Sequence, residues 1–589
     1  MPSEICDVVI IGGGTAGLVL ANRLSEDDKL QVVVLESGND RTGDMVTLTP
    51  GAWPLLPESP DQWLFPANPQ TDLKRAIKIP QGKALGGSSA VNSFLFTSTS
   101  KLSVETWEKL GNHGWGFAEF DQALKKSFTL HKLSGGSEGE GPLQLSLAEP
   151  ESVWEKAWIE GLQSVGYPRA DALSGRLGGP VIAAESIDPK TKQRSYATNA
   201  YYDPVRKRSN LVIRTDTTVT KILLDKSSST AVAKGVQYMK DGVSATIEAR
   251  KEVILCAGAI NSPRVLELSG IGGAGLLKRL GIDVVVDNPH VGENLQNHVF
   301  TGLVFNVKDG VDTLDAFFRQ EEAAQAAANQ DYASGKGPLA TSNMITMAQL
   351  PLPDFHSDTE RAELERLLNV SPSSDVSTPA FAAVHKAFVQ SVLTSPSEAV
   401  GNYVLGPAYA PFDSPGLDPK YRAPGKYIAI AVKLSHPLSR GSVHVTSSDA
   451  SLAATNEGVK VDCRYLSHPL DIEVLARQLR FMEDLVLRAE PIAQHLLDTE
   501  RRFADLEKSK QFVRDTADGA YHYTGTCAMM GRDMGGVVDD RLRVYGVKGL
   551  RVCDASVIPL EPTANPQAIV YAVAERAAEL IKEDLKSEV

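Results

Sequence analysis

Cysteine is scarce in this chain, and its spacing fits neither a metal site nor a disulfide framework. The 589 residues include five cysteines, an odd number spread over the whole length: Cys6, Cys256, Cys463, Cys527 and Cys553. No two of them form a C-x-x-C pair, the spacing typical of zinc sites and thiol redox motifs. We therefore predict no bound metal and expect buried free thiols in a reducing compartment.

Positive charge and long apolar runs are also in short supply. The formal net charge is −13, with 60 Lys and Arg against 73 Asp and Glu, which argues against nucleic acid or an anionic membrane as a partner. Glycine interrupts the longest apolar runs, so no membrane span is predicted. The start, MPSEICDVVIIGGG, lacks a basic segment followed by an apolar run and a cleavage site. We therefore expect no secretory signal and a cytoplasmic location.

The bulk composition is that of an ordinary globular protein. Hydrophobic residues make up 42% of the chain and charged residues 23%, both close to the usual values. A chain of this length exceeds what one hydrophobic core normally holds, so two or more domains are expected.

The first specific pattern is a glycine turn between a strand and a helix. Residues 7–26 read DVVIIGGGTAGLVLANRLSE, in which a β-branched run meets three glycines and an apolar helical pattern follows. This order is what the G-x-G-x-x-G fingerprint of dinucleotide sites requires. Gly12 permits the tight turn, Gly14 lets the backbone approach a pyrophosphate, and Gly17 lets the helix pack on the strand. The phosphates would lie at the helix N-terminus.

An acidic residue follows at the expected distance. A second strand, QVVVLESG, ends in Glu36, which lies 19 residues after Gly17, the spacing of an acid that binds a ribose hydroxyl. A tight turn with no ligand would leave the same local pattern. The fingerprint by itself does not distinguish FAD from NAD.

Several longer segments carry a resemblance to a known family. They occur in family order from residue 7 to about 583 and read GKALGGSSAVNSFLF (82–96), GAINSPRVLELSGIG (258–272), VGENLQNH (291–298), HPLSRGSVHV (436–445), YLSHPLDIEVLA (465–476) and the block at 517–581. Together they resemble the glucose–methanol–choline (GMC) oxidoreductases, which are FAD enzymes that oxidise alcohols. For the second segment, structural packing alone is an equally open interpretation.

The resemblance implies an α/β fold, α+β overall. It consists of a Rossmann-like FAD-binding domain and a discontinuous substrate domain made of an antiparallel sheet with helices. We assign residues 1–45, 78–100, 205–305 and 515–589 to the FAD-binding domain. The substrate-binding domain then takes 46–77, 101–204 and 306–514. Residues 306–430 have the weakest pattern: RQEEAAQAAANQ favours an exposed helix, whereas SPSSDVSTPA and GPAYAPFDSPGLDPKYRAPG favour loops, either pocket walls or plain surface elaboration.

The resemblance also implies which residues hold FAD. They are Gly12, Gly14, Thr15, Ala16, Gly17, Glu36, Gly86, Gly87, Ser88, Asn92, Val219, Asp554, Ala555, Pro566 and Gln567. The small side chains of GGSS allow a flat ring to lie against backbone, and Asn92 offers an amide to the flavin edge. NLVIRTDTTVTKILLD favours a strand pair near Val219. In EVILCAGAINSPRVLELSG, Ser262 and Pro263 are typical of a helix start. Asp554 either lies near the flavin ribityl or phosphate or caps a local turn.

The chain departs from the family pattern at several positions. TSTS follows Phe96 where an arginine-glycine pair and acidic residues are frequent, and Asn297 stands where aspartate is usual. Some relatives attach the flavin to a histidine in the first segment, and the matching residue here is Val91. Valine cannot form that bond, so we predict non-covalent FAD.

The last block contains the residues with catalytic chemistry. In the family a histidine ahead of Gly-Thr faces the flavin, and the match here is His522, with Asn565 as its partner 43 positions later. A neutral imidazole can remove a hydroxyl proton near neutral pH, and an amide can donate to the alkoxide that forms. The alternatives are a packed core histidine and a helix N-cap in Asn565-Pro566. HYTGT replaces the more frequent HPVGT, and Tyr521 and Tyr523 flank the histidine.

These patterns predict an FAD-dependent oxidation of an alcohol to a carbonyl. His522 would remove the proton and flavin N5 would accept the hydride, with O2 or another compound as the electron acceptor. We expect a small intracellular alcohol, aromatic or from secondary metabolism. A second hypothesis is a redox-neutral cyclase or lyase that keeps the flavin for structure. A third is a non-catalytic binding protein, which the intact glycine loop and His/Asn pair disfavour. Fold alone does not name the substrate.

Overall fold

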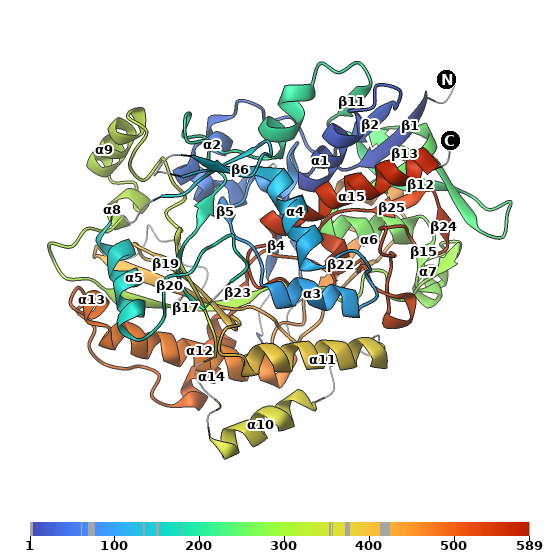
Figure 1. Ribbon diagram of the computed structural model, residues 1–589. Helices are drawn as coiled ribbons and strands as arrows, with labels where there is room; N and C mark the ends of the chain where they lie inside the picture. The colour runs from blue at the N-terminus through green and yellow to red at the C-terminus, as the bar shows by residue number, and fades with distance from the viewer. Residues whose placement is uncertain are drawn as a thin grey trace.

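The chain forms two adjoining halves, each built around its own sheet and hydrophobic core (Figure 1). The computed structural model describes residues 4–59, 62–68, 73, 77–132, 136–148, 152–176, 178–352, 355, 357–370, 377–412 and 424–587. Both predicted components, a Rossmann-like sheet and an antiparallel sheet with helices, are present, so the predicted fold class is confirmed.

The first half is a mixed eight-stranded sheet. Its main path runs β11-β2-β1-β14-β13-β12, with β24 beside β13 and β25 beside β14. The strands are β1 (Glu4–Ile11), β2 (Val32–Leu35), β11 (Leu211–Arg214), β12 (Thr218–Asp225), β13 (Ala231–Lys240), β14 (Val243–Leu255), β24 (Val547–Lys548) and β25 (Leu550–Val552). β1 is parallel to β2 and β14, whereas β12, β13 and β14 are antiparallel.

Helix α1 (Thr15–Leu24) connects β1 to β2 and completes the predicted βαβ unit. Its residues are almost all buried, because the helix packs between the sheet and the C-terminal helix α15 (Gln567–Ser587). α15 also packs on α4 (Phe117–Ser127). Figure 1 shows the red α15 beside the blue N-terminal elements, so the first and last segments of the chain share one core.

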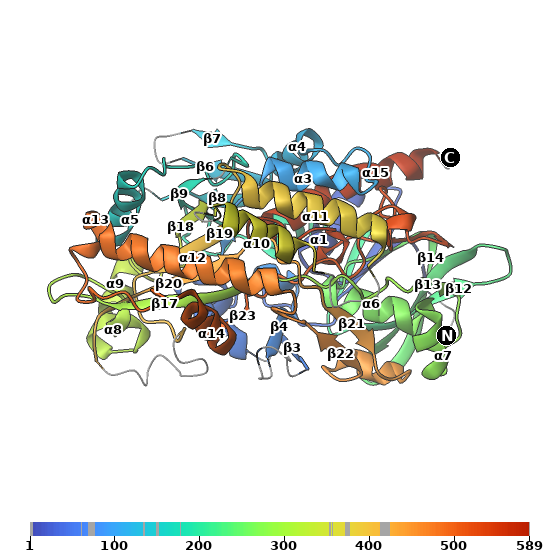
Figure 2. The ribbon, with the colours of Figure 1, turned by 90° about the horizontal axis from the view of Figure 1, so that it is seen from below.

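The second half is a six-stranded sheet in which every pair of neighbours is antiparallel. Its strands, in spatial order, are β23 (Asp518–Gly519), β17 (Val299–Asn306), β20 (Tyr427–Leu434), β19 (Gly401–Gly406), β18 (Thr346–Leu350) and β9 (Gly179–Ile182). Helix α12 (Pro469–Arg488) packs across β17 and β20. Seen from below, α12 lies across this sheet, and α10 (Asp358–Leu368) and α11 (Pro379–Thr394) lie beside α12 on the same side of the molecule (Figure 2).

Smaller elements fill the space between and around the two sheets. The remaining strands are β3 (Gln62–Pro66), β4 (Lys78–Gly82), β5 (Leu95–Phe96), β6 (Phe128–His131), β7 (Ser137–Glu138), β8 (Leu143–Ser146), β10 (Ala184–Glu185), β15 (Ile271–Gly272), β16 (Val286–Asp287), β21 (Ser442–Val445) and β22 (Val459–Asp462). The remaining α-helices are α2 (Met45–Leu48), α3 (Lys101–Lys109), α5 (Val153–Ser164), α6 (Gly258–Leu268), α7 (Ala274–Arg279), α8 (Asp315–Phe318), α9 (Glu322–Ala333), α13 (Glu490–Ala493) and α14 (Leu506–Thr516).

The assignment of residue ranges to two domains stays a prediction. Every strand of the first sheet lies in a range predicted for the FAD-binding domain. Two strands of the second sheet, β17 and β23, also fall almost entirely in such ranges. The chain therefore crosses from one sheet to the other at β17 and β23, close to the residues described below as the candidate site.

Two local predictions were wrong. β11 and β12 are both strands, but they do not pair with each other: β11 pairs with β2, and β12 pairs with β13. The link between them instead follows the segment after β2, because Asp216 N donates to Gly38 O and Thr217 N donates to Glu36 O.

The second wrong prediction concerns Ser262 and Pro263, which were expected at a helix start. Helix α6 begins five residues earlier, with Gly258 in place of Pro263 as its first residue, and Pro263 lies inside it. A proline there cannot donate to the carbonyl of residue i−4, Ala259. The hydroxyl of Thr526 donates to that carbonyl at 2.6 Å instead. A side chain from the C-terminal block thus supplies the hydrogen bond that the helix lacks.

The weakly patterned region contains more structure than its sequence indicates. The predicted helix in RQEEAAQAAANQ is present as α9 and is mostly exposed. Of the two predicted loops, residues 371–376 and 413–423 lie outside the described residues, while α11 begins at Pro379, inside the first of them. Among the residues described, no helix combines the length and the apolarity needed to cross a bilayer.

Candidate functional site

A cavity of about 310 Å³ lies where the two halves meet. It is lined by the glycine turn after β1, the end of β2, the 87–95 loop, β12, the start of α6 and the C-terminal block. Its lining includes fifteen of the predicted site residues: Gly12, Gly14, Thr15, Ala16, Glu36, Gly87, Ser88, Asn92, Val219, His522, Asp554, Ala555, Asn565, Pro566 and Gln567. Segments more than 500 residues apart in the sequence therefore form one continuous wall.

Two predicted residues, Gly17 and Gly86, do not line the cavity. Gly86 adopts φ +98°, a left-handed conformation that suits glycine. A Cβ on Gly17 would be 2.0 Å from the carbonyl oxygen of Gly12. Both glycines shape the backbone beside the cavity, and their predicted part in holding FAD stays a prediction.

The two glycine loops approach each other closely at one end of the cavity. A Cβ on Gly87 would be 2.7 Å from Cα of Gly14, so any side chain there would collide with the turn after β1. Helix α1 begins at Thr15, and none of its first-turn residues is acidic. The positive end of the helix therefore faces the cavity with no carboxylate in its own first turn, which suits a pyrophosphate.

Glu36 lies at the end of β2, as predicted, and lines the cavity. Its carboxylate accepts hydrogen bonds from the backbone N–H groups of Gly13 and Gly38, each at 2.7 Å. Burial raises the pKa of Glu36 to about 7, although both hydrogen bonds oppose the shift. The carboxylate is thus fixed beside the glycine turn, where a ribose hydroxyl would meet it.

Asn92 belongs to a network that the sequence does not indicate. Its Oδ1 accepts from the Arg194 guanidinium at 2.7 Å, and its Nδ2 donates to Gln567 Oε1 at 2.9 Å. Gln567 in turn donates to Ser186 Oγ at 3.1 Å. Arg194 is fully buried and also donates to the Ser89 carbonyl. This guanidinium therefore sets the orientation of the two amides that were predicted to contact the flavin.

Asp554 caps a local turn, one of the two roles that the sequence left open, and its position beside the cofactor stays a prediction. Its Oδ1 accepts from Ser556 N at 2.7 Å, which caps a short 3₁₀ turn. Its Oδ2 accepts from Gly258 N at 2.9 Å at the start of α6 and also from the Ser262 hydroxyl. Because the residue also lines the cavity, local capping and a position beside the cofactor do not exclude each other.

His522 lies in the cavity wall, and Asn297 and His298 hold its backbone and its ring. Its backbone N–H donates to Asn297 Oδ1 at 2.8 Å, and its Nδ1 is 2.8 Å from Nδ1 of His298. His298 is completely buried, and its Nε2 lies 2.7 Å from the Pro562 carbonyl. A carbonyl only accepts, so His298 Nε2 carries a hydrogen and its Nδ1 is the accepting atom when the ring is neutral. His522 Nδ1 must then donate, and its Nε2 keeps a free lone pair.

The electrostatic surroundings keep His522 neutral. Burial is the main cause of a pKa well below the usual value, and the positive charge of Lys433 and the neighbouring His298 add to it. A neutral imidazole with a free Nε2 is the form that can accept a proton. The geometry thus favours the catalytic interpretation over that of a packed core histidine.

Asn565 is oriented by Lys433, a residue that the sequence analysis did not identify. Lys433 Nζ donates to Asn565 Oδ1 at 3.0 Å. Lys433 is the donor in this contact, so the amide oxygen faces the lysine and the NH2 group is the remaining end. The predicted helix cap is shifted, because α15 begins at Gln567 instead of Pro566. Asn565 is therefore positioned as a hydrogen-bond donor at the cavity.

Replacing Lys433 with methionine is expected to lower kcat/KM for an alcohol substrate about tenfold, because the Asn565 amide loses its fixed orientation. Lys433 lies in β20, is 5% exposed, and has its pKa lowered to about 7 by burial. The charge of Lys433 lowers the pKa of both His522 and Glu561, so its removal should move the acid limb of the pH profile to higher pH. The measurement is kcat/KM against pH.

Lys426→Met is the matched control, because Lys426 precedes the same strand and its Nζ donates to the Val311 carbonyl instead. That variant should keep both the rate and the pH profile of the natural chain. Equal profiles for Lys433→Met and the natural chain would contradict the role assigned to Lys433.

Comparisons with known proteins identify the family of the chain. Residues 6–300 and 437–574 match the N-terminal and C-terminal family models described as GMC oxidoreductase. The GMC oxidoreductase family protein Mala s 12 of Malassezia sympodialis is 34% identical over 98% of this chain and 92% of its own length. A dehydrogenase of Armillaria gallica is 34% identical over 99% of this chain and 94% of its own length. The chain belongs to the GMC oxidoreductase family.

Solved structures show the same fold along the whole chain. An FAD-dependent oxidoreductase from Chaetomium thermophilum superimposes with a TM-score of 0.85 at 26% identity, covering 99% of this chain and all of its own. A fungal aryl-alcohol oxidase superimposes with a TM-score of 0.83 at 26% identity, covering all of both chains. The predicted family, and with it the FAD cofactor, is confirmed.

The residues present fit FAD. The backbone is free of side chains at Gly12, Gly14 and Gly87, where a pyrophosphate would lie. A side chain at Gly12 or Gly87 would collide with neighbouring backbone. The cavity extends from these glycines to His522 and Asn565, which matches a long dinucleotide with its reactive ring at one end. Val91 also lines the cavity and has no atom that could bond covalently to the ring.

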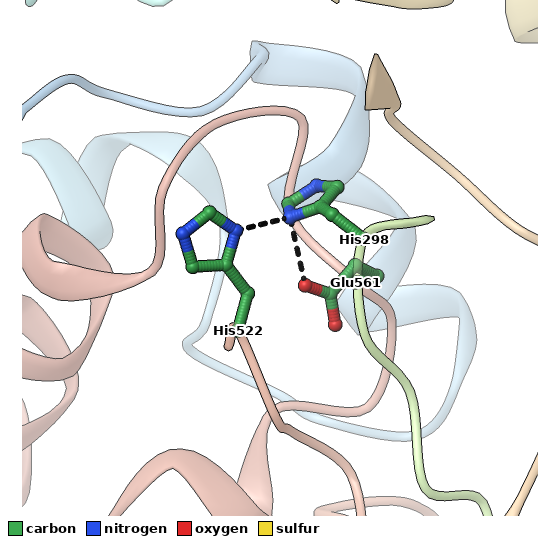
Figure 3. Close-up of side chains that lie close together, drawn as sticks. All are labelled: His298, His522 and Glu561. Carbon is green, nitrogen blue, oxygen red and sulfur yellow. Dashed lines mark hydrogen bonds and ion pairs between the residues drawn. The ribbon is translucent and has the colours of Figure 1, made fainter. Parts of the chain in front are cut away.

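One grouping of side chains could not be read from sequence spacing. His298, His522 and Glu561 place one nitrogen or oxygen atom each within 4.8 Å of one another, an arrangement that could hold a metal ion (Figure 3). The absence of a metal stays a prediction. Glu561 and Lys433 each stand alone as a charge in an apolar stretch, VIPLEPTANP and YIAIAVKL, and this isolation is the signal that could have identified them.

Proposed function

We propose that this chain oxidises an alcohol to a carbonyl compound with FAD as the hydride acceptor. The observation that carries the proposal is the pairing, in one cavity wall, of a neutral His522 with a free Nε2 and an Asn565 with its NH2 group presented. An alcohol hydroxyl placed between them meets one proton acceptor and one hydrogen-bond donor.

The residues divide the work as follows. His522 Nε2 takes the hydroxyl proton, and the Asn565 amide donates to the oxygen as negative charge develops. Two fixed contacts to one oxygen also orient the adjacent C–H bond. Bound FAD would supply the acceptor for the hydride from that bond. Asn297 and His298 hold the His522 backbone and ring, so the base does not have to reorganise during the reaction.

The substrate we propose is an aromatic or otherwise largely apolar alcohol. The cavity wall contains several aromatic side chains, among them Trp53, Phe94, Tyr521 and Tyr523. Tyr521 lines the cavity next to His522, is 49% exposed and adopts φ +63°, a backbone conformation that few non-glycine residues adopt. Aromatic walls favour flat apolar ligands.

The test is anaerobic reduction of the FAD-loaded protein by a panel of primary alcohols, aromatic and aliphatic, followed by absorbance. We expect an aromatic alcohol to bleach the flavin and the matching aldehyde to form in equal amount. Re-admission of air would then show whether O2 is the electron acceptor, because O2 would reoxidise the bleached flavin. A flavin that no alcohol bleaches would contradict the proposal and would favour redox-neutral chemistry on the same fold.

A further inference from the structure

Glu561 is a buried acid whose two carboxylate oxygens have different surroundings. The side chain is 1% exposed. Its Oε2 accepts a hydrogen bond from the Thr524 hydroxyl. Its Oε1 is buried and has no hydrogen-bond partner among the described residues, although His298 Nδ1 lies only 3.1 Å away. An unsatisfied buried carboxylate oxygen is costly, and a proton on His298 Nδ1 would satisfy it.

The three side chains are connected through one nitrogen of His298 in a bent arrangement, and His522 lies in the cavity wall. Figure 3 shows both contacts leaving the same atom, Nδ1 of His298: one to His522 and one to Glu561. The other ring nitrogen of His298 stays bonded to the Pro562 carbonyl. A proton that arrives from His522 can therefore leave His298 toward Glu561 without any movement of the ring.

The surroundings of these three side chains favour a proton on Glu561. Burial lowers the pKa of both His298 and His522, so neither imidazole retains a positive charge easily. Burial raises the pKa of Glu561 to about 8, although the Thr524 hydrogen bond, Arg440 and Lys433 oppose the shift. On the remaining side, His436 faces the backbone carbonyl of Glu561 at 2.9 Å. Protonated Glu561 with two neutral imidazoles is thus the arrangement with the fewest buried charges.

We propose that Glu561 receives, through His298, the proton that His522 removes from the substrate; the inference rests on the function proposed above. The substrate O–H bond breaks as an N–H bond forms at His522 Nε2. The hydrogen on His522 Nδ1 moves to His298 Nδ1 and then to Glu561 Oε1. Both histidines end neutral, because each passes on one proton for the one it receives. The substrate oxygen becomes negative as the Glu561 carboxylate becomes neutral, so the total charge does not change. His298 and Glu561 act through His522 and are positioning residues.

Glu561→Gln tests the proposal, because glutamine keeps the shape and can still accept from Thr524 but cannot take up a proton. We expect the rate constant of flavin reduction at pH 8 to fall at least about tenfold. The natural chain should lose activity as the pH falls through the pKa of Glu561, about 8, because the protonated acid cannot accept. In the variant that limb should move to lower pH, because the remaining base is His522, whose pKa burial holds well below its usual value.

Glu185→Gln is the matched control. Glu185 is also buried, also accepts from a threonine hydroxyl, Thr341 at 2.9 Å, and lies outside the cavity wall. This control should keep the rate and the pH profile. Glu561→Asp retains a carboxylate and should keep the limb near pH 8 at a reduced rate. A Glu561→Gln variant with the rate and profile of the natural chain would overturn the proposal.

An infrared titration separates this proposal from the proposed function. The difference spectrum between the natural chain and Glu561→Gln, recorded without any alcohol, reports whether Glu561 carries a proton. We expect a protonated carboxyl band that disappears as the pH rises through about 8. A band that disappears near the ordinary carboxyl value, about 4, would overturn the relay. If no alcohol reduces the flavin, the proposed function fails, yet this band still decides the state of Glu561.

Discussion

Replacing His522 with alanine is expected to lower the rate constant for reduction of the bound flavin by an alcohol about 10³-fold, within the range known for a lost general base. The alanine cannot take the hydroxyl proton, and the neighbouring imidazole of His298 does not replace it, because His298 directs its free nitrogen at residue 522 and its other nitrogen at the Pro562 carbonyl. FAD binding should be little changed, because the residues predicted to hold the pyrophosphate and ribose lie at the other end of the cavity. Stopped-flow absorbance at a saturating alcohol concentration measures the rate.

Added imidazole separates a chemical role from a structural one. Alanine leaves a space at the cavity wall that an imidazole molecule can enter, and a free base there should restore part of the rate in proportion to its concentration. His131→Ala serves as the control, because His131 contacts Gln144 on β8 and lies outside the cavity wall. A His522→Ala protein that reduces its flavin at the natural rate would exclude His522 as the base.

The first βαβ unit illustrates what the sequence can predict. A β-branched strand, a glycine turn, an amphipathic helix and an acid at a fixed distance are all local features, and each follows from backbone geometry over a few residues. The structure places β1, α1, β2 and Glu36 where these features indicate. Strand pairing is less local. β11 and β12 are separated by only three residues, yet they join opposite edges of the sheet, and nothing in their own composition fixes that choice.

Helix ends show a second limit. Ser262 and Pro263 are typical of a helix start, but α6 begins earlier because distant side chains supply what its own residues lack. Asp554 accepts from the first helical N–H group, and Thr526 replaces the hydrogen bond that Pro263 cannot make. Tertiary contacts of this kind override local capping preferences, and they appear only when the C-terminal block is seen to lie against α6.

The candidate site shows the same division between residues with a motif and residues without one. His522 and Asn565 were identified because they belong to a block that resembles a family. His298, Lys433 and Arg194 were not, because each acts through another side chain from a different element. His298 precedes His522 by 224 positions in the chain. The family resemblance predicts the atoms that face the substrate, whereas the tautomer of His522 and the orientation of Asn565 depend on these supporting residues.

Replacing Gly17 with alanine is expected to weaken FAD binding at least tenfold and to destabilise the fold, although Gly17 lies outside the cavity wall. Helix propensity alone predicts the opposite sign, because alanine in a helix is favoured over glycine by about 1 kcal/mol. Here the new Cβ would be 2.0 Å from the Gly12 carbonyl oxygen and 3.4 Å from Cys256 Cβ. Overpacking of this kind typically destabilises a fold by about 1–3 kcal/mol. The collision can be removed only if α1 moves away from the glycine turn.

Moving α1 displaces the N–H groups at its N-terminus from the place where the pyrophosphate would lie, and this displacement links a packing change to FAD affinity. Gly275→Ala is the matched control, because Gly275 also lies in the first turn of a helix, α7, where the nearest atom to a new Cβ is a flexible arginine end at 3.7 Å. The control should be neutral or slightly stabilising. Titration of the FAD-free protein with FAD, followed by flavin fluorescence, and urea unfolding measure the two effects. A Gly17→Ala protein that binds FAD normally and is more stable would show that helix propensity outweighs the close approach at this turn.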